Sequence, residues 1–380
     1  MPRLPAIEGL RAWLAWVVVL CHIGQSIGIG MRGGHWVWIA RGGQTAVLVF
    51  IAISGFVICG LLVDKREGWR RYIVRRAFRL FPAYLVAYAI ALAVFPVGLA
   101  GITYMSWRDD ANFQWDDVLA GWEQAMADHP IVQLLLHAAL LQGVVPDSIW
   151  PLTSSAVLSP AWSLSLEWQF YLLAPAAVWL LVQRSTRLLT VAVILAAAIA
   201  FKKNAFGEYS LPSFLPGAGY IFLVGIGCRL AFPSLKGAPL ALELPVVALG
   251  FGILFPELLW LAVWVALFAF LLSADVWRDR DAMRPLWRVM SAALESRLAV
   301  YLGARSYSVY LIHLPIIQIM IWLLAPRIEL TQLGLFFALI VTVVPVTMIV
   351  SNVLYRVVER PMIELGARLA RRPTLPEACT

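Results

Sequence analysis

The sequence predicts an all-α integral membrane protein with about ten transmembrane helices and both termini in the cytoplasm. Of the 380 residues, 61% are hydrophobic and only 14% are charged, which is far more apolar than a soluble domain. Apolar windows of roughly 20 residues, the helix length that crosses the hydrocarbon core, recur along the chain. Basic residues gather in alternate loops, as they do in proteins that cross a membrane repeatedly.

Ten apolar stretches are interpreted as spans. The first is a helix and not a cleaved signal peptide, because it stays apolar for a full spanning length without a convincing small-residue cleavage site. Pro256 separates the seventh span from the eighth, because proline interrupts helical hydrogen bonding. The spans run near Leu10 to Gly28, Gln44 to Val63, Leu80 to Leu99, Pro160 to Val182, Leu188 to Phe201, Pro216 to Leu230, Leu240 to Phe255, Glu257 to Ala274, Leu298 to Ala325 and Thr331 to Tyr355.

The orientation follows from lysine and arginine, which are enriched in cytoplasmic loops. Ten spans place both termini on one side, and most of the 30 Lys and Arg residues then fall on that side. The densest group runs from Lys65 to Arg79, and further groups lie between Arg278 and Arg297 and from Arg356 to Arg372. This side is therefore predicted to face the cytoplasm.

A further apolar stretch, Ile131 to Val145, is too short to cross the bilayer comfortably. Counting it as a span would reverse every later loop and remove the charge asymmetry. We expect a short amphipathic or re-entrant helix near 131–145 at the outer face. The residues before it, Gly101 to His129, form the largest predicted external loop.

One membrane domain is expected over residues 1–362, followed by a short cytoplasmic tail over 363–380, because no repeat or appended soluble domain is visible. The net charge of +8 does not indicate nucleic acid, because the basic residues lie along the inner membrane boundary, where anionic lipids are the expected partners. The four cysteines are scattered without a CxxC pair, so no metal site is expected. No oligomeric state is indicated.

An arginine and a histidine share the first span with ten residues between them. Eleven helical steps make about three turns, so Arg11 and His22 lie on one face, about 16 Å apart along the axis. Ionisable groups are expensive inside a bilayer, which makes a functional site the favoured explanation. A histidine with a purely structural role is the alternative.

Five motif-bearing stretches are spread along nearly the whole chain: Ile7 to His22, Gly42 to Ile58 with its Ser-Gly-Phe ending, Arg75 to Tyr84, Ala161 to Pro175, and Tyr301 to Pro315. Together they resemble the acyltransferase-3 family of membrane O-acyltransferases, which acylate bacterial surface sugars and some small molecules. A Glu-Arg-Pro motif beginning at Glu359 closes the pattern. Departures from it are Glu8 in place of aspartate, Ala46 in place of glycine, Ile51 in place of phenylalanine, and Arg305 at a position expected to be apolar.

The resemblance implies an enzyme of the bacterial inner membrane that takes its acyl group from acyl-CoA, with acetyl-CoA as the favoured donor. Coenzyme A carries a 3′-phosphate and a diphosphate, and guanidinium groups bind such oxygens bidentately while remaining ionised. Arg76 and Arg79 lie three residues apart on one helical face, and Arg11 lies on the same inner side. These three arginines are the candidate coenzyme A ligands, although a membrane anchor is the alternative role for the pair.

At the thioester, His22 is the candidate general base, because imidazole has the ordinary pKa best suited to proton transfer at neutral pH. Glu167 is the candidate partner that orients His22, and His313 is the candidate that binds the acceptor or polarises the acyl carbonyl. Direct transfer and a route through an acyl-histidine are both consistent with these residues.

The function expected from the sequence is transfer of an acyl group, favoured as acetyl, from cytoplasmic acyl-CoA to a hydroxyl of a surface-glycan sugar or its lipid-linked precursor. A macrolide or similar small molecule is the alternative acceptor. A transporter or flippase is the alternative class of protein, since charged midplane sites occur there too, but no paired inverted repeat supports it.

Overall fold

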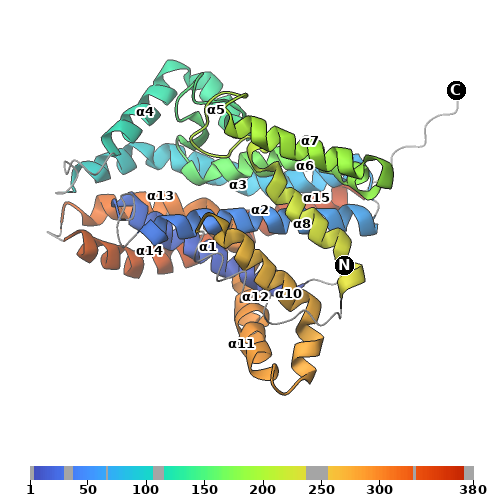
Figure 1. The fold of residues 1–380 in the computed structure, drawn as a ribbon. Helices are drawn as coiled ribbons and strands as arrows, with labels where there is room; N and C mark the ends of the chain where they lie inside the picture. The colour runs from blue at the N-terminus through green and yellow to red at the C-terminus, as the bar shows by residue number, and fades with distance from the viewer. Residues whose placement is uncertain are drawn as a thin grey trace.

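The computed structural model describes residues 4–29, 37–65, 67–105, 115–236, 256–327 and 331–371. Within these ranges the chain consists of helices joined by turns and short 3₁₀ segments, with no β-strand (Figure 1). The predicted all-α fold class is therefore confirmed.

Nine helices in the described ranges are long and apolar enough to cross a membrane. They correspond to the predicted spans, except that the predicted span Leu240 to Phe255 lies outside the described residues. They are α1 (Pro5–Ser26), α2 (Val37–Lys65), α3 (Trp69–Thr103), α6 (Trp162–Val182), α7 (Arg184–Lys202), α8 (Leu215–Leu235), α10 (Leu259–Asp279), α13 (Ser306–Leu324) and α14 (Gln332–Leu354), the last of which continues through a π-helical turn (Tyr355–Glu359) into α15 (Arg360–Leu369).

The third span begins eleven residues before its predicted start at Leu80. Helix α3 runs for 35 residues from Trp69, so the predicted loop Lys65 to Arg79 is largely helical. Hydropathy excluded these turns because they are rich in arginine, but arginine is a good helix former. A helix of this length measures about 52 Å, which exceeds the hydrocarbon core, so α3 extends beyond the bilayer.

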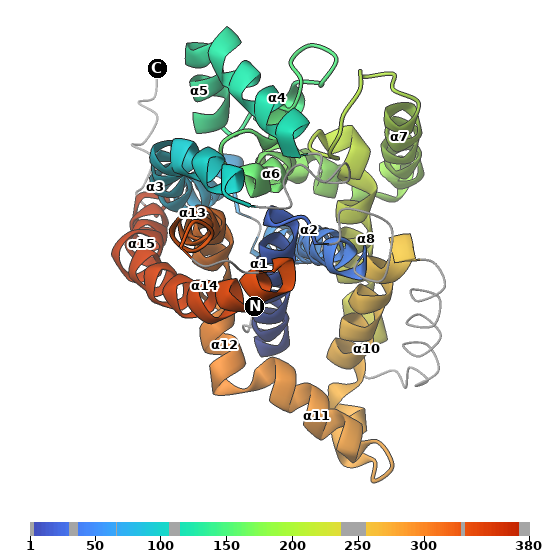
Figure 2. The same cartoon turned by 90° about the vertical axis from the view of Figure 1, so that its left-hand side faces the viewer.

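The predicted span Leu298 to Ala325 is wrong as a single helix. The chain forms α12 (Arg297–Gly303), changes direction at Ala304 and Arg305, and begins α13 at Ser306 (Figures 1 and 2). Gly303 packs so closely on the first turn of α1 that an added Cβ would lie 1.8 Å from the carbonyl oxygen of Glu8. This close approach positions the break beside the start of α1.

The predicted short helix near 131–145 is α5 (Pro130–Ala138), followed by a 3₁₀ turn at Gln142–Val144. Nine residues extend about 14 Å, which is too short to cross the hydrocarbon core. Helix α4 (Trp115–Asp128) precedes it, within the loop predicted to be external. Both helices lie at the end of the bundle where α3 terminates (Figure 1).

The bundle is organised around α1, which lies between α2, α13 and α14 (Figure 2). Helices α2 and α8 pack backbone against backbone through two glycines. A Cβ on Gly55 would lie 2.3 Å from the Phe222 carbonyl oxygen, and one on Gly225 would lie 2.0 Å from that of Ala52. Small residues at such contacts allow membrane helices to approach closely.

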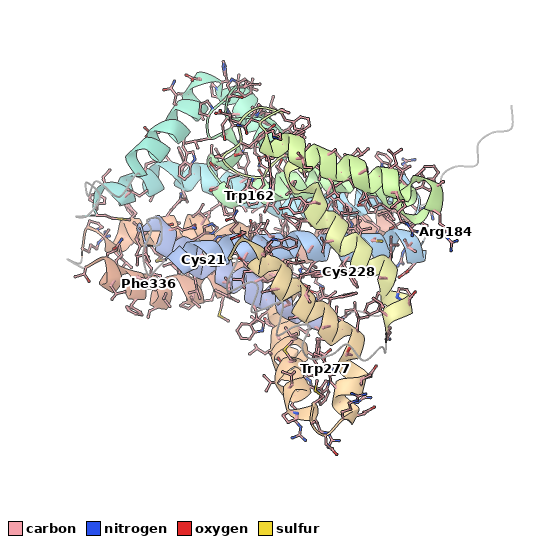
Figure 3. All side chains as sticks on the ribbon, viewed as in Figure 1. Cys21, Trp162, Arg184, Cys228, Trp277 and Phe336 are labelled. Atoms are coloured by element: carbon pink, nitrogen blue, oxygen red, sulfur yellow. The ribbon has the colours of Figure 1, made fainter. Side chains whose placement is uncertain are left out.

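Residues that the sequence analysis places on opposite sides of the membrane lie at opposite ends of the helical bundle. Arg184, the first residue of α7, and Phe336, near the start of α14, lie at opposite ends (Figure 3).

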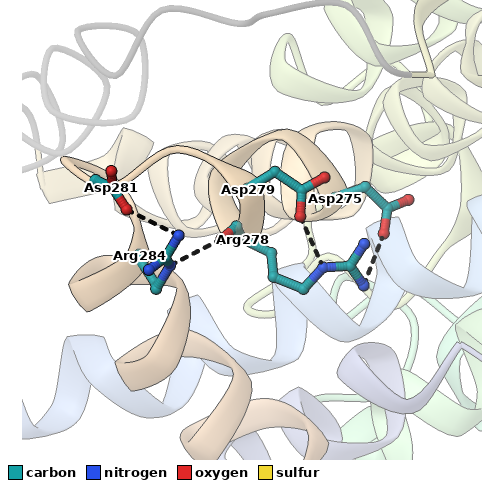
Figure 4. A network of polar contacts seen from close by, with 5 residues as sticks. All are labelled: Asp275, Arg278, Asp279, Asp281 and Arg284. Carbon is teal, nitrogen blue, oxygen red and sulfur yellow. Dashed lines mark hydrogen bonds and ion pairs between the residues drawn. The ribbon is translucent and has the colours of Figure 1, made fainter.

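Helix α10 leads into α11 (Arg284–Glu295), and this pair projects from the bundle (Figure 1). Its corner carries exposed ion pairs, which contribute little stability: Arg278 with Asp275 and Asp279, and Arg284 with Asp281 (Figure 4).

Candidate active site

A cavity of about 330 Å³ lies among α1, α2, α3, α6 and α13. It brings together four residues that the sequence analysis selected from three separate segments: Arg11, Arg76, Arg79 and Glu167. Most of the remaining wall is apolar or carries hydroxyl groups. The wall also carries the carboxylates of Glu8 and Glu167, but the arginines outnumber them, and a group of cations beside apolar side chains is suited to an anionic ligand with a long uncharged part.

Arg76 is available for a ligand. Its guanidinium carbon lies 5.8 Å from the centre of the Tyr171 ring, and its buried Nε has no hydrogen-bond partner among the described residues. The neighbouring Arg75 also lines the cavity but is engaged, because its Nη1 lies 2.8 Å from Glu67 Oε1. Among the described residues, Arg75 is therefore paired within the protein, whereas the Arg76 Nε is not.

Arg79 and Arg11 face the same cavity with different counter-charges. Arg79 lies one turn after Arg76 on α3 and interacts electrostatically with Glu359, which is 2% exposed. Arg11 Nη1 lies 3.3 Å from Glu8 Oε2, one turn earlier on α1. Each of these cations thus has a carboxylate nearby that keeps its charge balanced in the absence of a ligand.

Glu167 does not contact His22, contrary to the expectation from the sequence. Its Oε1 accepts hydrogen bonds from Ser54 Oγ at 3.0 Å and from the Tyr171 hydroxyl. Ser54 and Tyr171 both line the cavity, so Glu167 belongs to the arginine-rich wall. It therefore holds hydroxyl groups and balances charge there, and another residue orients His22.

That residue is His313. His22 Nδ1 and His313 Nε2 lie 2.8 Å apart, and the two rings are stacked with centroids 5.0 Å apart and an interplanar angle of 19°. His313 is fully buried, whereas His22 is partly exposed. His313 therefore contacts the candidate base directly, which the sequence analysis did not anticipate, and its expected role in binding the acceptor or polarising the acyl carbonyl stays a prediction.

The backbone determines the direction of this hydrogen bond. His313 Nδ1 lies 3.2 Å from the carbonyl oxygen of Val309, and a carbonyl only accepts, so the proton of neutral His313 is on Nδ1. His313 Nε2 then accepts a hydrogen bond from His22 Nδ1. The lone pair of His22 is left on Nε2, in the arrangement that a general base requires.

Tyr310 separates the cavity from the histidine pair. It lines the cavity, and its ring centroid lies 5.9 Å from that of His313, one turn further along α13. The Tyr310 hydroxyl bonds to Ser163 Oγ and to the carbonyl oxygen of Pro160, both at 2.8 Å. His22 and His313 are not part of the cavity wall, and Tyr310 is the lining residue whose ring lies beside that of His313.

Three residues at or near the site had no assigned role in the sequence analysis. Ser306 and Tyr310 line the cavity, and the buried Glu359 accepts a hydrogen bond of 2.5 Å from Ser308. For Ser306 and Tyr310 the available signal was a polar side chain in an apolar span, and for Glu359 it was the Glu-Arg-Pro motif. Arg305, which the sequence marked as unusual, is instead directed to Asn352, its Nε lying 3.0 Å from Oδ1.

Comparison with known proteins identifies the family. The family model of the acyltransferase-3 proteins, described as an acyltransferase domain, matches residues 4–355. The chain belongs to the acyltransferase-3 family. This acyltransferase is 27% identical over its whole length to acyltransferase MdmB of Streptomyces mycarofaciens, of which it covers 96%. Over 96% of its length it is 25% identical to peptidoglycan O-acetyltransferase OatA of Listeria monocytogenes, of which it covers only 56%.

No solved structure matches this acyltransferase. The family, together with the helical bundle, establishes that it is a multi-pass membrane enzyme that transfers acyl groups. Within the described residues no group of three or more His, Cys, Asp or Glu side chains is arranged to hold a metal ion.

Proposed function

We propose that this acyltransferase moves an acetyl group from cytoplasmic acetyl-CoA to a hydroxyl of a surface-glycan sugar or its lipid-linked precursor, at the bacterial inner membrane. The observation that carries the proposal is the arrangement along α1. Arg11 lines a cavity with Arg76 and Arg79, and His22, about three turns further along α1, is oriented by His313.

The arginine-rich cavity is suited to the nucleotide end of the donor. Its unpartnered Arg76 Nε is a buried hydrogen-bond donor that only a ligand or water can satisfy. Phosphate oxygens are matched to guanidinium groups in charge and geometry. Arg11 and Arg79 lie in the same wall, where the charge-enriched end of the bundle favours entry from the cytoplasm.

The histidine pair is suited to the reacting end. His22 Nε2 removes the proton of the acceptor hydroxyl as that oxygen attacks the thioester carbonyl carbon. The new C–O bond forms, the C–S bond breaks, and the coenzyme A thiolate takes the proton from His22 to leave as a thiol. His313 accepts the hydrogen bond from His22 Nδ1 throughout and stabilises the imidazolium that forms transiently.

The nature of the acceptor is supported by a relative. OatA is named a peptidoglycan O-acetyltransferase, which supports an acetyl donor and a glycan acceptor for this chain as well. His22 lies on α1 toward the end of the bundle opposite the arginines, so donor and acceptor approach from opposite sides.

The test uses the full chain in lipid nanodiscs with radiolabelled acetyl-CoA and a panel of bacterial oligosaccharides, lipid-linked glycans and macrolides. We expect label in a glycan ester, and its loss in His22→Gln but not in His137→Gln, the same change at the buried His137. Label only in a small molecule would change the acceptor. In proteoliposomes, movement of substrate without ester formation would support a carrier and overturn the proposal.

A further inference from the structure

The break before α13 places a helix N-terminus against the cavity wall. Ser306 and Tyr307, the first two residues of α13, line the cavity together with Tyr310, one turn later. The first amides of a helix have no partner within it, and the N-terminus carries a partial positive charge. A continuous span over Leu298 to Ala325 would have offered no such group at this position.

Ser306 supplies a second, independent observation. Its side chain is 2% exposed and lines the cavity, and its Oγ has no hydrogen-bond partner among the described residues. A buried hydroxyl without a partner is costly, and native proteins rarely leave one unsatisfied. Ser308, two residues later and also buried, shows the usual arrangement, because its Oγ donates to Glu359.

The charges around Ser306 indicate the kind of partner. Arg11, Arg76 and Arg79 line the same cavity, and the Arg76 Nε is likewise buried without a partner. Glu359 accepts from the backbone amide as well as the hydroxyl of Ser308, so the third amide of α13 is occupied. The first two amides, which have no partner within the helix, and the Ser306 hydroxyl belong to residues that line the same cavity as three guanidinium groups, which is the chemistry of a phosphate site.

We propose that the N-terminus of α13 and the Ser306 hydroxyl bind a phosphate group of the phosphorylated thioester donor. The inference rests on the proposed function, since it refines the site of the same donor. The carboxylates of Glu8, Glu167 and Glu359 repel an anion and offset the charge of the three arginines. The helix N-terminus and the Ser306 hydroxyl therefore supply further attraction for the phosphate.

The same geometry relates the phosphate site to the chemistry. Helix α13 carries both the proposed phosphate ligand Ser306, at its start, and His313, which orients His22, about two turns later. A phosphate held at the start of α13 leaves the flexible arm to extend along this helix past Tyr310. Helix α13 then fixes both ends of the donor.

The test compares donors with and without phosphate. Acetyl-CoA, acetyl-dephospho-CoA and S-acetylpantetheine are supplied to the full-length enzyme in nanodiscs, with Ser306→Ala, Ser306→Thr and Ser351→Ala as variants. Ser351 is as buried as Ser306, lies outside the cavity wall and is bonded within its own helix, so Ser351→Ala is the matched control. Monodisperse elution and the melting temperature check that each variant folds.

We expect Ser306→Ala to raise KM for acetyl-CoA roughly tenfold, the effect of one lost hydrogen bond to a charged group, with kcat unchanged. KM for S-acetylpantetheine should stay within about twofold, because that donor has no phosphate. Ser306→Thr, which retains the hydroxyl, should recover the KM for acetyl-CoA. If acetyl-dephospho-CoA shows the same rise as acetyl-CoA, the group bound is the diphosphate; if it does not, the group is the 3′-phosphate.

Two results would overturn the inference. An equal change for acetyl-CoA and S-acetylpantetheine, or no change for either, means that Ser306 is satisfied by water or packing and binds no phosphate. If the unaltered enzyme uses none of the three donors, the proposed function itself fails, and the phosphate site fails with it. The unaltered enzyme therefore separates the two failures.

Discussion

Removal of the imidazole at position 313 tests the central geometry of the site. In His313→Ala, His22 Nδ1 loses its acceptor, which lies 2.8 Å away in the structure. A hydrogen bond to a group that becomes charged contributes about 1.5–3 kcal/mol, and about 1.36 kcal/mol corresponds to a factor of ten in rate. We therefore expect kcat to fall about ten- to a hundredfold, with KM for acetyl-CoA within about twofold.

Two further variants define the role. His22→Ala removes the base itself and should lower kcat by about 10²–10⁴, more than His313→Ala. His313→Gln retains an amide oxygen that accepts from His22 Nδ1, so part of the rate should return. His137→Gln is the control for loss of a buried imidazole, since His137 is also fully buried but stacks on Tyr88 away from the site.

The assay is steady-state acetyl transfer from radiolabelled acetyl-CoA in nanodiscs, with kcat and KM determined separately for every variant. The reasoning is refuted if His313→Ala retains the kcat of the unaltered enzyme, or if its loss appears only in KM for acetyl-CoA. An additive effect in the double variant with His22→Ala would also contradict it, because residues that act as one unit are not additive.

Three other outcomes follow from the structure. Arg76→Ala should raise KM for acetyl-CoA roughly ten- to a hundredfold, whereas the exposed Arg71→Ala should not, as enzyme kinetics would reveal. Gly225→Ala places a Cβ 2.0 Å from a backbone oxygen of α2 and should destabilise the fold by about 1–3 kcal/mol or more, while Gly227→Ala, with open space, should not change the melting temperature in detergent. Burial lowers the pKa of the His137 side chain below its ordinary value of 6.5, so between the two pKa values His137 is protonated in the unfolded chain but neutral in the folded chain. The free energy of unfolding should therefore fall as the pH drops below about 6.5, and it should fall less in His137→Gln.

Hydropathy located the predicted spans that the structure describes, because it reports directly on burial in lipid, although it merged α12 and α13 into one. Its errors at helix ends have one physical cause, as α3 demonstrates. The first turns of α3, from Trp69 through Arg79, are helical but charged. Hydropathy therefore marks only the apolar part of the helix and misses the charged turns that extend it. The α-helical spacing of Arg76 and Arg79, in contrast, was predictable, because it depends only on local geometry.

The partners of the site residues were harder to predict, because depth in a membrane fixes only one coordinate. Glu167 and His313 were both expected near the depth of His22, but only His313 contacts it. Which way a side chain points around the helix axis depends on how the helices pack, and His22 and His313 are 291 residues apart. Close glycine contacts such as that of Gly303 with Glu8 contribute to this packing, and they are not visible in the hydropathy of either segment.

The break between α12 and α13 shows the same limit and also its functional consequence. Residues 298–325 are apolar enough to be interpreted as one span, and nothing in their periodicity marks Ala304 and Arg305 as a turn. The turn depends on Gly303 meeting the backbone of Glu8, a contact between segments almost 300 residues apart. That same contact brings the start of α13 to the arginines, which face it from α1 and α3. A span that is irregular only where it borders a polar cavity is tolerated in a membrane because the freed amides gain partners there, so the break and the anion site are best understood as one feature.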